Sequence, residues 1–361
     1  MFRRRTVLAL MLVGVVPAFA LINTLVSAAR TSRESIAVDW ARQGDANLAA
    51  GRAMDAADDY QTADEYARNR GTHRLQLAMA LVAADRLPEA EAQLQTLWNT
   101  APGDGVVNLQ LARVAARQLR VSDAVRYYHA AIDGAWTDDA VGQRRAARLE
   151  LARFLLERGD RTQAQVELVA LAADPPPEIQ GQIDLAGLLV DAGADNRALT
   201  LLASALRADP TNTRAAALAG RIDARIGDYR DARAYLERAR RSGGLTGDDE
   251  ALLDTVTRVL DLDPDARGLS SRERLRRTVR AFEIASAAVG RCETDALGAL
   301  RDRRDRLAPR VTERTLAGDP DTVDDTLAFV AGALDAAHAD CGAGSPDERA
   351  LQLAFQRRPQ S

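Results

Sequence analysis

The segment AEAQLQTL at residues 90–97 decides the fold, because its pattern returns at a fixed spacing along the chain. AVRYYHAA at 124–131 repeats it, with Ala124 in the place of Ala90. Both begin with alanine, carry a large apolar residue four positions on, and have another apolar residue three positions after that. Residues spaced in this way lie on one face of an α-helix. The distance between the two segments is typical of repeated helical hairpins.

Six copies of the pattern share one register. The alanines are Ala56, Ala90, Ala124, Ala164, Ala198 and Ala232, and the differences between their successive numbers are 34, 34, 40, 34 and 34. The large apolar residues are Tyr60, Leu94, Tyr128, Leu168, Leu202 and Leu236. Twelve positions before each alanine stands a small residue, in order Gly44, Ala78, Ala112, Ala152, Ala186 and Gly220. The sequence therefore predicts paired helices that approach closely at these small residues.

Turn signals fall between the predicted helices. Glycine occupies the turn inside four hairpins, at Gly51, Gly159, Gly193 and Gly227, whereas Asp85 and Leu119 stand at that place in the other two. Pro102, Pro176 and Pro210 mark ends of units, since proline cannot continue a helix. The six surplus residues near 134–142 predict a longer turn or helix between the third and fourth units.

These residues resemble the tetratricopeptide repeat (TPR) family, and Trp40 matches the tryptophan of its pattern. The resemblance covers residues 37–246 as six units, at 37–70, 71–104, 105–138, 145–178, 179–212 and 213–246. It implies an all-α protein, a right-handed superhelical α-solenoid of six hairpins. It also implies that a peptide or protein binds in a concave groove formed by the first helix of each hairpin.

Carrying the groove positions over unit by unit gives a mixed set of apolar and basic residues. The predicted partner-binding residues are Leu75, Met79, Val82, Leu109, Arg113, Arg117, Arg153, Leu156, Arg214, Arg221 and Arg225. Arg113, Arg117 and Arg221 have no acidic residue three or four positions away along the helix. Because guanidinium binds carboxylate through two hydrogen bonds, an acidic partner is expected. Solvated arginines on an arginine-rich surface are the alternative.

The N-terminal segment predicts a membrane anchor. Residues 6–29 carry no charge and follow three arginines. These 24 residues span about 36 Å as a helix, more than the ~30 Å hydrocarbon layer. Residues 1–29 are therefore expected to form one transmembrane helix or an uncleaved signal, joined by a short linker (30–36) to the repeats. The alternative is a signal peptide cleaved near Ala20. Both place the bulk of the chain on the periplasmic side.

The region after the repeats predicts a capping helix within 247–264 and a small helical bundle at 265–361. Helices are expected at about 270–290, 294–307 and 321–340. The only two cysteines, Cys292 and Cys341, follow the first and third of these helices, which end on the same side of an up-down-up arrangement. A disulfide between them is predicted; two separate buried thiols are the alternative.

Composition and motifs favour a binding protein over an enzyme. The net charge of −4 argues against a dedicated nucleic-acid binder. The three histidines lie far apart in sequence, and neither a catalytic motif nor metal-ligand or cofactor spacing appears. We therefore expect a membrane-tethered scaffold of the cell envelope that binds a protein partner, with no catalytic, cofactor or metal site. The alternatives are a permanent subunit of an envelope assembly and a cytoplasm-facing regulator.

Overall fold

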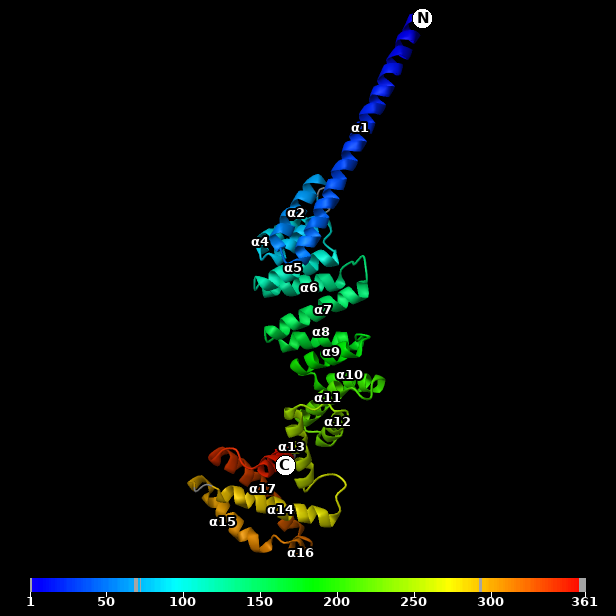
Figure 1. The fold of residues 1–361 in the computed structure, drawn as a ribbon. Coiled ribbons are helices and arrows are strands. Elements are labelled where there is room, and N and C mark those ends of the chain that lie inside the picture. Colours follow the sequence, from blue (N-terminus) through cyan, green and yellow to red (C-terminus); the bar gives the residue numbers. More distant parts are fainter. Residues whose placement is uncertain (1, 68–70, 72, 292–293, 357–361) are drawn as a thin grey trace. The chain divides into compact units, whose positions relative to one another are not determined.

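The chain is α-helical in the computed structural model, which describes residues 2–67, 71, 73–291 and 294–356, without the side chains of 2–18 and 30. No extended strand occurs among these residues. The helices, which Figure 1 colours along the sequence, belong to two compact units, Met1–Leu171 and Ala172–Ser361.

Helical hairpins make up the first two thirds of the sequence. Their first helices are α1 (Phe2–Ala49), α3 (Arg74–Ala83), α5 (Gly105–Arg117), α7 (Ala140–Glu157), α9 (Ile179–Asp191) and α11 (Thr213–Ile226). Their second helices are α2 (Ala53–Tyr66), α4 (Leu87–Thr100), α6 (Val121–Asp133), α8 (Arg161–Ala173), α10 (Asp195–Ala208) and α12 (Tyr229–Arg241). Each second helix begins three positions before its repeat alanine, so the period of the sequence is also the period of the helices.

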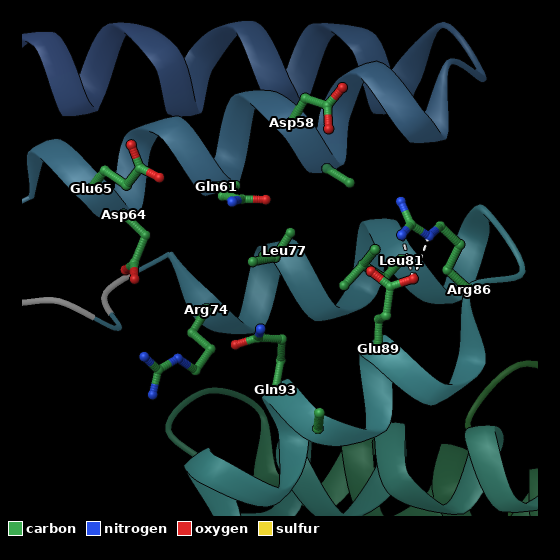
Figure 2. Close-up of a pocket in the computed structure, with 12 residues that line it drawn as sticks. Asp58, Gln61, Asp64, Glu65, Arg74, Leu77, Leu81, Arg86, Glu89 and Gln93 are labelled. Carbon is green, nitrogen blue, oxygen red and sulfur yellow. Dashed lines mark hydrogen bonds and ion pairs between the residues drawn. The ribbon is translucent and has the colours of Figure 1, made fainter.

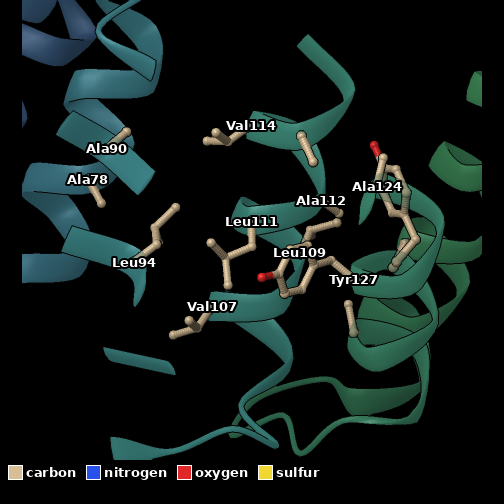
Figure 3. Packing of buried hydrophobic residues seen from close by; sticks show 14 of the residues in the cluster. Ala78, Ala90, Leu94, Val107, Leu109, Leu111, Ala112, Val114, Ala124 and Tyr127 are labelled. Carbon is tan, nitrogen blue, oxygen red and sulfur yellow. The ribbon is translucent and has the colours of Figure 1, made fainter. Parts of the chain in front are cut away.

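The small residues lie where the helices meet. All six repeat alanines are fully buried, as are Ala78, Ala112, Ala152 and Ala186 in the first helices. In the first unit, Tyr60, Leu94 and Tyr128 complete a core that runs from α2 to α8. Figure 3 shows part of this packing around Leu94, Leu111 and Tyr127. Small groups at the contact and large ones beside it produce the close packing expected of a protein interior.

The turns inside the hairpins share one backbone conformation. Gly51, Gly159, Gly193 and Gly227 all have positive φ, between 76° and 82°. Asp85 and Leu119 have φ of 60° and 62° at the equivalent places. The two departures from glycine therefore keep the left-handed turn, although a side chain there is unfavourable.

The six surplus residues lengthen a helix and a loop. Helix α7 has 18 residues where α5 has 13, and the loop before it folds back onto the turn between α4 and α5. The amide of Gly105 donates to the carbonyl of Ala135 at 2.8 Å, and that of Ala135 donates to Gly103 at 2.8 Å. Trp136 donates from Nε1 to the carbonyl of Ala131 at 2.9 Å.

Replacing Gly105 with alanine is expected to destabilise the first unit. A Cβ at this position would lie 2.4 Å from Cε2 of Trp136, so the indole must move. We expect a loss of about 1–3 kcal/mol, as for overpacked cores. Gly103→Ala is the matched control, because no atom lies within 4 Å of its Cβ position. Thermal unfolding followed by tryptophan fluorescence measures both; equal midpoints for the two variants would contradict the described packing.

In the second unit, α9–α12 are followed by α13 (Gly247–Leu262) and a set of shorter and longer helices. These are α14 (Ser271–Gly290), η1 (Asp295–Leu297), α15 (Gly298–Leu307), η2 (Ala308–Arg310), α16 (Glu313–Leu316), α17 (Pro320–Cys341) and α18 (Pro346–Gln356). Helix α13 packs against α12 and α18. Ser270 caps α14 by accepting from the amide of Glu273, and the two residues form the Ser-x-x-Glu pattern of a capping box. The rings of Phe282 and Phe329 join α14 to α17 with their centroids 5.3 Å apart.

The ends of α14 and α17 lie together. Arg291 donates to the carbonyl of Gly342 at 3.4 Å, and Thr294 donates to the carboxylate of Asp340 at 3.0 Å. Cys341 is disulfide-bonded, whereas Cys292 lies outside the described residues. The pairing of these two cysteines stays a prediction.

The N-terminal helix differs from the expected anchor and linker. Helix α1 is continuous from Phe2 to Ala49, so residues 30–36 belong to it instead of forming a separate linker. Among the described residues, no helix combines the length and apolar character needed to cross a membrane. The predicted transmembrane helix is therefore without support from the structure.

Candidate functional site

The apolar residues assigned to the groove mostly belong to the core. Leu109 is buried, and Leu75, Val82 and Leu156 are half-buried against the core of the first unit. Met79 differs, since 37% of its surface is exposed. The first helices of this unit therefore offer far less apolar surface to a partner than the repeat pattern predicts.

Arg113 forms an ion pair between consecutive first helices. Its Nε and Nη2 donate to the two carboxylate oxygens of Glu150 on α7, both at 2.8 Å. Glu150 also accepts from the hydroxyl of Tyr128 at 3.0 Å. The hydrogen bond from Arg113 to Glu150 is the main cause that raises the pKa of the guanidinium. Burial, followed by the charge of Glu150, raises the pKa of Tyr128.

Arg117 on α5 reaches back to the preceding hairpin. Its Nη2 lies 2.8 Å from the carboxylate of Asp85, and its Nη1 donates to the carbonyl of Val82. Asp85 occupies the left-handed turn between α3 and α4. The side chain of Arg117 therefore joins α5 to a turn that lacks glycine.

The arginines of α11 in the second unit are paired in the same manner. Arg214 lies 2.9 Å from Asp184 on α9, and Arg225 contacts Asp195 at the start of α10. Arg221 lies 3.1 Å from Asp249 on α13.

The expectation of an acidic ligand rests on arginines that lack an acidic neighbour on their own helix, and these ion pairs remove that basis for most of them. No acid lies three or four positions away on the same helix, but neighbouring hairpins and helices bring carboxylates to Arg113, Arg117 and Arg221. Comparison along one helix misses these partners, because they belong to other elements of the chain. Arg153 is the exception, since it is exposed and has no ion pair among the described residues.

A hollow on another face of the first unit is lined by α2, α3 and α4, and Figure 2 shows α3 between the two second helices. Its volume is about 310 Å³. The lining residues are Ala57, Asp58, Gln61, Asp64 and Glu65 of α2, Arg74, Leu77 and Leu81 of α3, and Arg86, Glu89, Ala92 and Gln93 at and within α4. Leu77 and Leu81 are buried and contribute apolar surface.

The hollow has more negative than positive charge along its lining. Arg86 forms an ion pair with Glu89, and its Nε donates to the carboxylate at 2.6 Å. Asp64 accepts from the amide of His73 at 3.3 Å. Asp58 and Glu65 form no ion pair with any described residue. Two exposed carboxylates on one helix are thus available to a ligand. The repeat resemblance directs attention to the first helices and therefore misses this site.

Metal binding has no structural support in the described residues. None of their histidine, cysteine, aspartate and glutamate side chains gather in a group of three or more that would hold an ion.

Comparisons with known proteins show similarity only to solved structures. No family model matches the chain, and no curated protein matches it. YrrB, described as a TPR protein with an unusual peptide-binding site, is 15% identical, with 56% of this chain and 98% of that chain covered and a TM-score of 0.41. The C-terminal part of a TPR repeat-containing protein from Cytophaga hutchinsonii is 14% identical, with 79% and 98% covered and a TM-score of 0.44.

A third similar structure is the TPR2AB domain of yeast Sti1 in complex with an HSP90 peptide. It is 18% identical, with 62% of this chain and 99% of that chain covered and a TM-score of 0.26. All three TM-scores lie below 0.5, so the TPR-like character of this chain rests on its own helices and their packing.

Proposed function

We propose that this chain is a protein-interaction scaffold without catalytic activity. The observation that carries the proposal is the in-phase array of hairpins, whose second helices begin with the same period as the buried alanines. Such an array presents equivalent surface positions side by side on consecutive helices, which suits binding of an extended partner. A superhelical groove across all six repeats stays a prediction.

Within the first unit, the proposed contact face follows one repeat position along α3, α5 and α7. Met79, Arg113 and Arg153 occupy it in consecutive hairpins. Met79 offers a flexible apolar surface, which adapts readily to a partner. Arg153 offers an unpaired guanidinium, so the acidic partner remains part of the proposal at this residue, while Arg113 is held by Glu150.

Met79→Glu combined with Arg153→Glu tests the proposed face. Proteins captured by the tagged full chain from its own cells are quantified by mass spectrometry, with Val166→Glu on α8 as control, since Val166 is 64% exposed. The chain contains no lysine, so a photoreactive residue at the exposed position 83, one turn from Met79 on α3, supplies the crosslink. We expect the double variant to lose at least nine tenths of the captured partner and the control to retain it. An unchanged set of partners in the double variant would refute this face.

We further propose that the scaffold works outside the cytoplasm, at the cell envelope. The disulfide-bonded state of Cys341 supports this location, since such bonds persist in oxidising compartments. Anchoring through residues 6–29, or cleavage near Ala20, remains a prediction from sequence. Extraction of native membranes with alkaline carbonate distinguishes the two, because only an uncleaved anchor keeps the chain in the membrane pellet.

A non-reducing tryptic digest checks the predicted pairing of Cys292 with Cys341. Trypsin cleaves this chain only at arginine, so the two cysteines fall in peptides 292–301 and 315–349. We expect these peptides to run as one linked species that reduction separates. Two free thiols in protein taken from its native compartment would contradict both the pair and the proposed location.

A further inference from the structure

We propose that the hollow between α2, α3 and α4 binds a basic segment of a partner protein, through two arginine or lysine side chains that match the spacing of two carboxylates on its rim. This inference rests on the proposed function, because it assumes a protein ligand. It concerns a different surface, since neither Met79 nor Arg153 lines the hollow.

The hollow has a suitable size and shape for long basic side chains. Its volume of about 310 Å³ is at the lower end of ligand sites. Leu77 and Leu81 lie beneath the rim and are buried, with Ala57 beside them. Arginine and lysine pack their aliphatic stems on apolar surface and keep their charged ends at its edge.

The charges on the rim favour cations. Asp58 and Glu65 lie on α2 with Gln61 between them (Figure 2). Neither carboxylate is held by an ion pair in the described part of the chain. Glu89 already neutralises Arg86, which leaves Arg74 as the cation of the lining that forms no ion pair with a described residue. The hollow therefore attracts a partner of opposite charge through two separate carboxylates.

The spacing of the carboxylates defines the ligand. Asp58 and Glu65 are seven residues apart on α2, which is about 10.5 Å along a helix. A polyproline II segment has three residues per turn and rises about 3.1 Å per residue, so two of its residues three apart lie on the same side, about 9 Å apart. A partner segment in this conformation with basic residues at positions i and i+3 therefore matches both carboxylates at once.

Fluorescence anisotropy with defined peptides tests the proposal on the full chain. The probe is a labelled eight-residue peptide of alanine and leucine with arginines at its third and sixth positions. The first comparison peptide carries glutamate at both positions, and the second has adjacent arginines. We expect binding of the probe at low salt, at least fivefold weaker binding of the adjacent-arginine peptide, and no binding of the glutamate peptide.

Variants then assign the binding to the hollow. Asp58→Arg with Glu65→Arg should weaken probe binding at least tenfold, and the milder Asp58→Asn with Glu65→Gln at least threefold. The control Asp133→Arg with Asp138→Arg makes the same change in charge at residues outside the hollow and should change binding less than twofold. Circular dichroism establishes that each variant is folded.

Three results would overturn the inference: tight binding of the glutamate peptide, full binding by the folded Asp58/Glu65 variants, or equal loss in the control. Self-association that the same variants abolish would assign the hollow to a second copy of the chain, which also overturns it. Capture of a partner that depends on Met79 and Arg153 but not on Asp58 and Glu65 would sink this inference and leave the proposed function standing.

Discussion

Replacing Asp223 with asparagine will stabilise the chain at pH 8 and leave its stability at pH 4 nearly unchanged. Asp223 is only 5% exposed on α11, and no described cation pairs with it. Burial, together with the charges of Asp231 and Asp228, raises the pKa of its carboxyl to about 7. At the equivalent repeat position, the first helices of the other five hairpins carry Asn47, Leu81, Ala115, Leu155 and Leu189.

The direction of the effect follows from proton binding. The carboxyl of the unfolded chain has a pKa near 4. Below about pH 4 the group is therefore protonated in both states, and its ionisation does not lower the free energy of unfolding. Between about pH 4 and pH 7 the carboxyl loses its proton in the unfolded state but keeps it in the folded state. The free energy of unfolding therefore falls as pH rises. Three pH units correspond to at most about 4 kcal/mol. Asparagine removes the charge, so we expect a gain of about 2–4 kcal/mol at pH 8.

Urea unfolding at pH 4 and pH 8 measures this difference. The control Asp261→Asn replaces an exposed aspartate on α13 and should change the free energy of unfolding by less than about 0.5 kcal/mol at either pH. If Asp223→Asn raises stability equally at both pH values, or at neither, Asp223 is not a buried ionised carboxyl.

Replacing two glycines with alanine will have opposite effects on stability. Gly220 on α11 lies against the next helix, where a Cβ would be 2.6 Å from Cγ of Leu236 and 3.2 Å from the carbonyl oxygen of Ala232. Leu236 is fully buried and cannot move aside. Alanine improves helix propensity by about 1 kcal/mol, but overpacking of this kind costs more. Gly220→Ala should therefore destabilise the chain by about 1–3 kcal/mol.

Gly187 on α9 is the matched case, because nothing lies within 4 Å of its Cβ position. Gly187→Ala gains helix propensity without a clash, so we expect stabilisation of up to about 1 kcal/mol. Thermal melts of both variants beside the parent chain measure the two signs. A stabilising Gly220→Ala would mean that α11 and α12 do not approach as closely as described.

The sequence predicts the hairpins well because their signal is local and repeated. The register of alanines anticipates every second helix from α2 to α12, and the turn positions at Asp85 and Leu119 are found although they lack glycine. The Ser270 cap follows from a four-residue pattern. In each case the residues that decide the structure are close in sequence or recur at a fixed distance.

The candidate site is predicted less well because it depends on contacts between different hairpins, which are far apart in the sequence. Glu150 is 37 residues from Arg113, and no pattern within α5 reveals their ion pair. Leu109 reads as a groove residue by position but is buried by its neighbours. One missed feature has a usable signal: Asp223 stands where the aligned units carry leucine three times, which marks it as a buried charge.

Exact deletion of one period tests the central claim, that hairpins in phase build this protein. Removing residues 61–94 joins Tyr60 to Gln95 and takes out one full period, so the fused helix keeps its apolar face. Removing 61–92 instead leaves two extra residues, which rotate that face by about 200°. We predict that thermal unfolding of the full-period deletion stays cooperative with helicity per residue unchanged, whereas the shorter deletion loses helicity and cooperativity. Equal behaviour of the two deletions would contradict the account.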